Sequence, residues 1–204
     1  TTLRKQKTPL KALWPSHSSS NLMDGSTPPW FPAWCIEFDE PVSDPRAVAN
    51  TLIEHREDSR WMVLGHPTVL SERHLWAAWL AVSSRFEAGT MVSNSIDGEF
   101  LRLLSGTHQM KVAFTRAGLA IGDDKAWLVR LPEWTDGELV GHQASMDVVA
   151  DRLMGWLGAE LSPERPAPSA EGIQRLGLFQ DELPARETWE AACLTHIAMS
   201  DLGI

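Results

Sequence analysis

Residues 92–131, VSNSIDGEFLRLLSGTHQMKVAFTRAGLAIGDDKAWLVRL, predict two short helices, the turn between them and a following strand. An apolar stripe at helical spacing begins at Ile96, and Gly106 stands where a helix C-terminal cap is needed. Thr107 can cap the second helix, which Gly118 ends. We therefore expect two helices to meet at a corner, with the strand at 125–131.

The preceding residues predict a strand, a helix and a second strand. These are WCIEF at 34–38, a helix at 45–56 that begins with a proline, and the apolar run WMVL at 61–64. A continuous apolar run bounded by Gly and Pro is typical of a strand buried on both faces. The longest predicted helix follows, between an N-cap at Ser71 and a left-handed stop at Gly89.

After the strand at 125–131, apolar residues from Met146 to Leu157 recur at helical spacing, and a last helix is expected over 186–202. The segment 162–172, SPERPAPSAEG, is interpreted as a linker or long surface loop, because its three prolines exclude the interior of a helix or a sheet.

The fold class expected is α/β (α+β), with a single domain over residues 30–204 and a small mixed β-sheet flanked by helices. A length of 204 residues suits one core plus a tail. Residues 1–29 are basic and rich in Ser and Pro, which predicts a flexible tail. This tail is either a basic arm for RNA or an acidic partner, or a solvated terminus.

Composition limits the possible functions. The net charge of −9 means that the domain as a whole repels phosphate, so any nucleic-acid contact must be local. Cys35 and Cys193 form no C-x-x-C pair and give no reason to expect a disulfide or a zinc site. The sequence has no apolar run of about eighteen residues and no secretory h-region, so a cytoplasmic location is expected.

The common catalytic motifs are absent. The sequence has no G-x-G-x-x-G, Walker A, H-E-x-x-H or G-x-S-x-G motif, and its seven histidines are scattered. We expect no catalytic residues, no metal and no cofactor. One alternative is a small-molecule enzyme with Glu99 and His108 as acid and base. His108 and Gln109, beside the Gly turn, form the best polar candidate site, although the turn also suits a structural role.

Three segments carry a family resemblance. They are VLSERHLWAAWLAVSSRFEAG at 69–89, VSNSIDGEFLRLLSGTHQMKVAFTRAGL at 92–119, and LGLFQDELPARETWEAACLTHIAMSDL at 176–202. Together with the β-α-β start, they resemble the Cgi/TPRKB kinase-binding family of the KEOPS complex of archaea and eukaryotes. The middle segment is the most specific. Nine residues agree with the family pattern there: Ser93, Ser95, Glu99, Leu101, Ser105, Gly106, Gln109, Ala113 and Gly118.

Three residues depart from that pattern. Asn94 stands where the family commonly has Lys, Leu103 where it often has Tyr, and His108 where it usually has Arg. Two basic groups that would face RNA phosphate are therefore neutral or weakly basic in this chain.

The resemblance implies a non-catalytic regulatory subunit of a complex that makes threonylcarbamoyladenosine in tRNA. Such a subunit binds a Bud-type atypical kinase directly, contacts the catalytic transferase subunit indirectly, and in archaea helps recruit tRNA through its 3′ CCA end. An unpaired RNA end needs little net positive charge on the protein. The RNA-binding candidates are Asn94, Ser95, Ser105, Gly106, Thr107, His108 and Gln109.

The resemblance also implies a surface for the kinase, for which Met110, Phe114 and Ile197 are the candidates. A further alternative is a plain protein–protein adaptor without RNA binding, which the departures at Asn94 and His108 favour.

Overall fold

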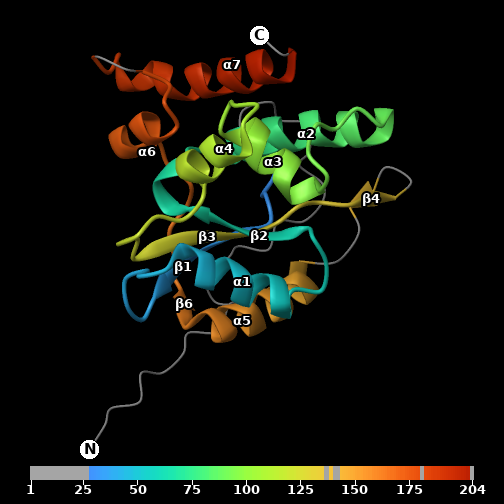
Figure 1. Ribbon diagram of the computed structural model, residues 1–204, viewed down its shortest axis with the longest axis vertical. Coiled ribbons are helices and arrows are strands. Elements are labelled where there is room, and N and C mark those ends of the chain that lie inside the picture. Colours follow the sequence, from blue (N-terminus) through green and yellow to red (C-terminus); the bar gives the residue numbers. More distant parts are fainter. Residues whose placement is uncertain (1–27, 136–137, 140–142, 180–181, 203–204) are drawn as a thin grey trace, which may run out of the picture.

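The computed structural model describes residues 28–135, 138–139, 143–179 and 182–202, and centres on one four-stranded sheet (Figure 1). The strand order is β2 (Trp61–Gly65), β3 (Lys125–Arg130), β1 (Ala33–Phe38) and β6 (Ala159–Leu161). The α+β class is confirmed. The sheet is not mixed, however, because β3 inserts between β1 and β2 and all three strand pairings are antiparallel.

Strand β1 supplies side chains to two separate cores. Successive side chains of a strand point to opposite faces of the sheet. Trp34 and Ile36 therefore enter one core, in which α1 (Pro45–His55) and α5 (Gln143–Leu157) cover the sheet. Cys35 enters the other core, on the opposite face.

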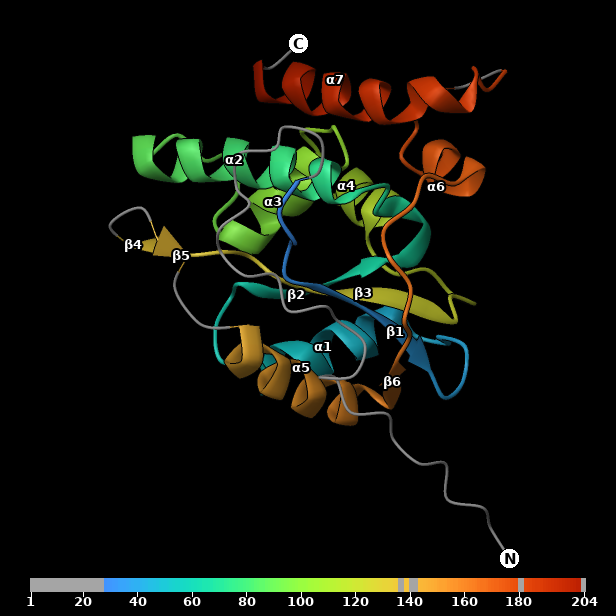
Figure 2. The same ribbon diagram turned by 180° about the vertical axis from the view of Figure 1, so that it is seen from behind.

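The second face carries two layers of helices (Figures 1 and 2). Next to the sheet lie α2 (Glu72–Ala88), α3 (Ile96–Leu104) and α4 (Met110–Ala117), and outside them lie α6 (Ala170–Arg175) and α7 (Trp189–Leu202). The short elements are the 3₁₀ turns His66–Thr68 and Arg186–Thr188 and the β4–β5 pair, Trp134–Thr135 with Glu138–Leu139.

The helix ends follow the predicted capping residues in several places. The Ser71 side chain accepts from the His74 backbone N–H at the start of α2, and Gly89 ends this helix at a φ of 65°. Ser95 caps α3 in the same way, by accepting from the Gly98 N–H. The predictions for Ser71 and Gly89 are confirmed.

The predicted N-cap of the second helix is wrong. Thr107 does not cap α4, because this helix begins only at Met110, with Gln109 as its N-cap residue. The Thr107 hydroxyl instead accepts from the Gln109 N–H within the turn. The predicted end of α4 at Gly118 is confirmed, and this glycine is extended.

The Pro-rich segment 162–172 is also shorter as a loop than expected. Helix α6 begins inside it at Ala170, where the Ser169 side chain accepts from the Gly172 N–H. Strand β6, just before the segment, was not predicted from the sequence.

Most of the expected N-terminal tail, residues 1–27, lies outside the described residues. Its last residue, Pro29, accepts a hydrogen bond from the Trp76 indole at 2.8 Å. Among the described residues, no helix combines the length and apolar character needed to span a membrane.

Candidate nucleic-acid interface

The corner between α3 and α4 has a well-defined backbone. The Gly106 N–H donates to the Leu103 carbonyl at 3.1 Å, and the Thr107 N–H donates to the Arg102 carbonyl at 3.2 Å. Together with the left-handed φ of 61° at Gly106, these two bonds form a Schellman motif. The predicted role of Gly106 as a C-terminal capping residue is confirmed.

Helix α7 covers Gly106 from outside. A Cβ atom at Gly106 would overlap the imidazole ring of His196. The position therefore requires glycine for two independent reasons, its backbone conformation and the ring packed on it. The contact between these residues joins the corner to the last helix of the chain.

A buried ion pair organises the rest of α3. The Arg102 Nε donates to Glu99 Oε2 at 3.1 Å, and the Arg102 Nη2 donates to Oε1 at 2.5 Å. Glu99 Oε2 also accepts from the Ser93 backbone N–H at 2.8 Å, before the helix begins. At the other end, the Arg102 Nη1 lies 3.2 Å from His108 Nδ1. The pair thus connects the loop before α3 to the corner after it.

Both side chains of this pair are almost fully buried, with Glu99 0% and Arg102 1% exposed. Burial acts to raise the pKa of the Glu99 carboxyl, but hydrogen bonds from Arg102 and Ser93 and the nearby positive charges outweigh it. The pKa of Glu99 therefore lies below its usual value, and Glu99 stays ionised.

Arg116 adds a positive charge to the corner. Its Nη1 donates to the Ser105 carbonyl at 3.2 Å, and the ion pairs between described residues do not include it. Burial, and secondarily the charge of Arg116, lower the pKa of His196. Lys111 is exposed on α4. The corner is thus locally basic in a chain whose net charge is −9.

The seven RNA-binding candidates do not form one group. Asn94 and Ser95 are exposed but precede α3, whereas the other five follow it. The nine residues of α3 span about 14 Å. At the corner, Ser105 is buried and donates to the Arg102 carbonyl. His108 and Gln109 are the exposed candidates of the corner.

The three candidates for a partner surface also differ in position. Phe114 is 57% exposed on α4, and Met110 is half-buried against the core. Ile197 is only 3% exposed, because it faces inward from α7 together with Trp189 and Cys193. Ile197 is therefore a core residue and not part of an exposed surface for a partner.

The geometry does not support Glu99 and His108 as an acid–base pair. Arg102 lies between them and contacts both. Neither residue lines the cavity beside His66 and Glu164 or the one beside Pro41 and Leu157. A buried, charge-paired carboxylate also lacks access to a substrate.

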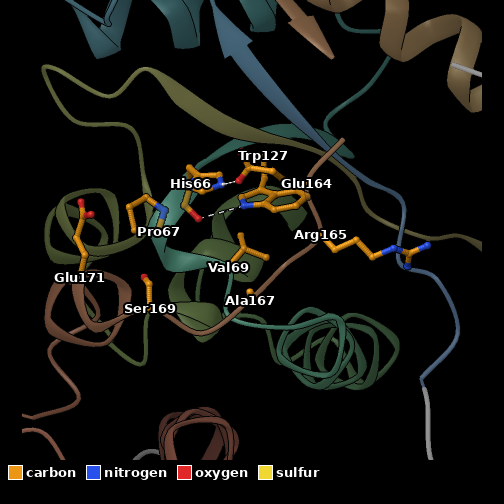
Figure 3. Close-up of a pocket in the computed structure, with 9 residues that line it drawn as sticks. All are labelled: His66, Pro67, Val69, Trp127, Glu164, Arg165, Ala167, Ser169 and Glu171. Atoms are coloured by element: carbon orange, nitrogen blue, oxygen red, sulfur yellow. Dashed lines mark hydrogen bonds and ion pairs between the residues drawn. The ribbon is translucent and has the colours of Figure 1, made fainter. Parts of the chain in front are cut away.

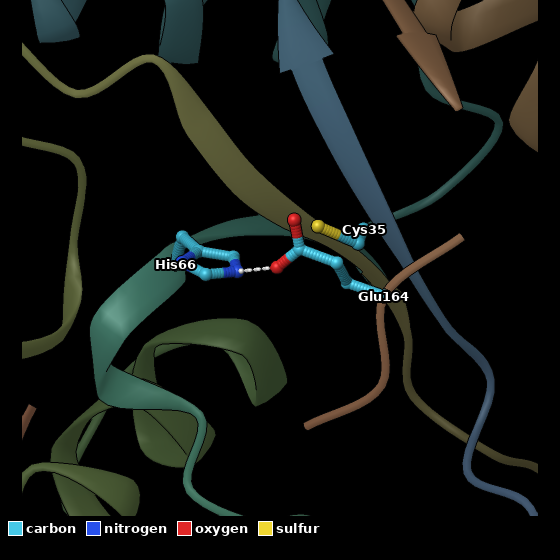
Figure 4. A group of neighbouring side chains, drawn as sticks. All are labelled: Cys35, His66 and Glu164. Atoms are coloured by element: carbon cyan, nitrogen blue, oxygen red, sulfur yellow. Dashed lines mark hydrogen bonds and ion pairs between the residues drawn. The ribbon is translucent and has the colours of Figure 1, made fainter. Parts of the chain in front are cut away.

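A second group of polar side chains lies at one end of the sheet. A cavity of about 190 Å³ is lined there by His66, Trp127 and Glu164, among others (Figure 3). The thiol of Cys35 lies beside them (Figure 4). These residues are far apart in the sequence and match no metal-binding motif, so sequence reasoning missed the cluster.

Comparison with known proteins does not assign the chain to a family. No protein-family model matches it, and a search of curated proteins finds no match to it. The resemblance to the Cgi/TPRKB family therefore stays a prediction made from the sequence.

Proposed function

We propose that this chain is a non-catalytic subunit of a KEOPS-type tRNA-modifying complex, which binds the Bud-type kinase and presents its α3–α4 corner to the 3′ end of tRNA. The observation that carries the RNA half of this proposal is the side chain of Gln109. It agrees with the family pattern, is exposed, and has no hydrogen-bond partner among the described residues.

The other polar residues that agree with the pattern all have a structural role. Ser95 caps α3, Glu99 forms the buried ion pair, and Ser105 is buried in the corner. The Ser93 N–H donates to Glu99. Each of these residues takes part in hydrogen bonds that hold the fold together, whereas the Gln109 side chain does not. Gln109 is therefore the residue most directly available to a ligand.

The start of α4 provides further groups for an RNA end. The N-cap residue of α4 makes no side-chain capping bond, so the first backbone N–H groups of the helix are open to an acceptor. Such a helix end favours a phosphate group. His108 and Lys111 lie exposed on either side of Gln109 and Met110. We expect a few local contacts, and hence a weak salt dependence of binding.

Binding of two forms of the cognate tRNA tests this half of the proposal. For intact tRNA, Gln109→Ala should weaken binding by about five-fold, the effect of losing roughly one hydrogen bond. Binding of tRNA that lacks its CCA end should be weaker and should not change with this substitution. The control is Gln143→Ala, at the start of α5 on the opposite face of the sheet, which should leave both affinities unchanged.

Equal losses on both tRNAs would contradict a contact with the CCA end and move the RNA site elsewhere, whereas no loss on either would leave the plain adaptor as the better interpretation. Gly106→Asp is a poor test of RNA binding, because its side chain would overlap His196 and disturb the fold.

The kinase half of the proposal rests on the sequence resemblance and on the exposure of Phe114. A large apolar side chain that is 57% exposed on α4 is suited to burial against a partner. Phe114 lies one turn of helix after Met110, on the helix that begins at the proposed RNA site. We expect the kinase to cover this side of α4.

A further inference from the structure

Three metal-ligating side chains converge on one face of the sheet. The Cys35 sulfur, a ring nitrogen of His66 and a carboxylate oxygen of Glu164 all lie within 4.8 Å of one another (Figure 4). We propose that these residues bind one divalent transition-metal ion of the zinc type, with a fourth coordination position open to the adjoining cavity. The geometry of this cluster carries the proposal, which is independent of the proposed function.

The fold brings the three donors together from separate segments. Cys35 is in β1, and His66 directly follows β2. The chain after β6 continues beside β1, because the Ser162 N–H donates to the Cys35 carbonyl at 2.9 Å. This bond places Glu164, two residues later, next to the thiol.

The donor atoms suit zinc better than magnesium or calcium. Sulfur, imidazole nitrogen and a carboxylate oxygen are the ligands that Zn²⁺ takes, whereas Mg²⁺ and Ca²⁺ require oxygen. Zinc bonds of about 2.0–2.3 Å place tetrahedral donors roughly 3.5 Å apart. The donors, which lie within 4.8 Å of one another, must therefore approach by about 1.3 Å at most. Glu164 can supply this movement, because it lies outside the regular elements and has a long side chain.

Contacts around the donors already orient them. The His66 ring stacks on Trp127 at an interplanar angle of 6°, and the Trp127 indole donates to the His66 carbonyl at 3.1 Å. His66 Nε2 faces Glu164 Oε2 at 3.0 Å. These contacts fix the position of the His66 backbone and the orientation of its ring.

The charges of the cluster can accommodate a divalent ion. Glu164 now pairs with the Lys125 ammonium group, which also lies 3.8 Å from Glu37. On binding, the ion takes the place of Lys125 at Glu164, and Lys125 keeps Glu37 as its partner. The Cys35 thiol gives its proton to solvent and binds as a thiolate, so thiolate and carboxylate together neutralise the ion.

The adjoining cavity leaves the fourth coordination position of the metal ion open. His66 and Glu164 line it together with Trp127, Arg165 and Ser169 (Figure 3). Cys35 is 1% exposed and closes the site from the interior of the sheet. The cavity has a volume of about 190 Å³, which is enough for water or a small ligand to complete the coordination.

Titration of the full chain with Co²⁺ tests the proposal, because a cobalt–thiolate bond gives a charge-transfer absorption band. We expect this band to saturate at one equivalent of cobalt and to disappear when Zn²⁺ is added. Cys35→Ser should abolish the band. The matched control is Cys193→Ser, which removes the other buried cysteine, in α7, and should leave the band unchanged.

Two further variants keep the test informative if Cys35→Ser does not fold. Glu164→Gln should weaken cobalt binding at least about ten-fold. Lys125→Met should strengthen binding, because it removes the cation that competes for Glu164. The absence of a thiolate band in the unaltered chain, its persistence in Cys35→Ser, or weaker binding by Lys125→Met would overturn the proposal.

Discussion

The guanidinium of Arg102 and the carboxylate of Glu99 form a bidentate ion pair inside the protein, one turn apart on α3. Taking two charges out of water is costly, and here the cost is offset by further hydrogen bonds at both ends of the pair. The pair therefore holds the loop before α3 and the corner after it in fixed positions. The proposed RNA site depends on this support.

Removal of either partner should destabilise the protein strongly. Glu99→Gln leaves the buried Arg102 without its counter-charge, and Arg102→Met leaves Glu99 with only the more distant Arg85, at 3.9 Å. Each should lower the free energy of unfolding by about 3–5 kcal/mol. The double variant should lose less than the sum of the two single losses, because it leaves no unpaired charge. Urea unfolding of the four proteins measures this coupling, and additive losses would contradict the role given to the pair.

Gly106 and Gly89 allow the packing of His196 to be measured separately from backbone strain. Both glycines are left-handed, at φ of 61° and 65°, but a Cβ at Gly89 meets nothing within 4 Å. Gly89→Ala should cost about 1 kcal/mol, and Gly106→Ala should cost more because its methyl group overlaps the His196 ring. His196→Ala should reduce the cost at Gly106 only. Equal costs at the two glycines in thermal unfolding would show that α7 does not press on the corner.

His74 should make stability fall in mild acid. Its side chain is 1% exposed, and burial is the main reason why its pKa falls from 6.5 to about 4. The carbonyl of Leu104 opposes this shift, whereas the nearby His196 adds to it. The unfolded chain binds a proton near pH 6.5 that the folded chain does not bind until about pH 4. The contribution of neutral His74 to the free energy of unfolding is therefore complete above pH 6.5, and it is lost as the pH falls toward 4.

The expected loss over this range is about 3 kcal/mol. Unfolding experiments between pH 7.5 and 4 should show a shallower decline in His74→Gln than in the unaltered chain. The pKa of His196 is also lowered, so a variant with both substitutions should show the shallowest decline. Parallel curves for all three proteins would contradict a buried, neutral His74.

Features set by neighbouring residues were predictable from the sequence. Ser71 and Gly89 act through a hydrogen bond or a backbone angle within one helix end, and the sequence pattern located both. Thr107 shows the limit of this reasoning. A Ser or Thr after a Gly suits a cap, but two more residues, His108 and Gln109, follow Thr107 in the turn before α4 begins.

Features that join distant parts of the chain were not predictable. The His196 ring over Gly106 and the cluster of Cys35, His66 and Glu164 exist only because the sheet and α7 bring these segments together. Strand β6 has three residues and is defined by its pairing with β1, which leaves little pattern in its own sequence. For Ile197, helical spacing showed its face but not whether that face points inward.

Association with the kinase tests the central claim most directly. The purified chain and its proposed partner, the Bud-type kinase, should elute together in size-exclusion chromatography at micromolar concentrations. Phe114→Glu should weaken the complex, whereas Ile53→Glu, on α1 across the sheet and also 57% exposed, should not. Co-elution that is sensitive to Phe114 is the result we predict, and separate elution of the two unaltered proteins would contradict a kinase-binding subunit.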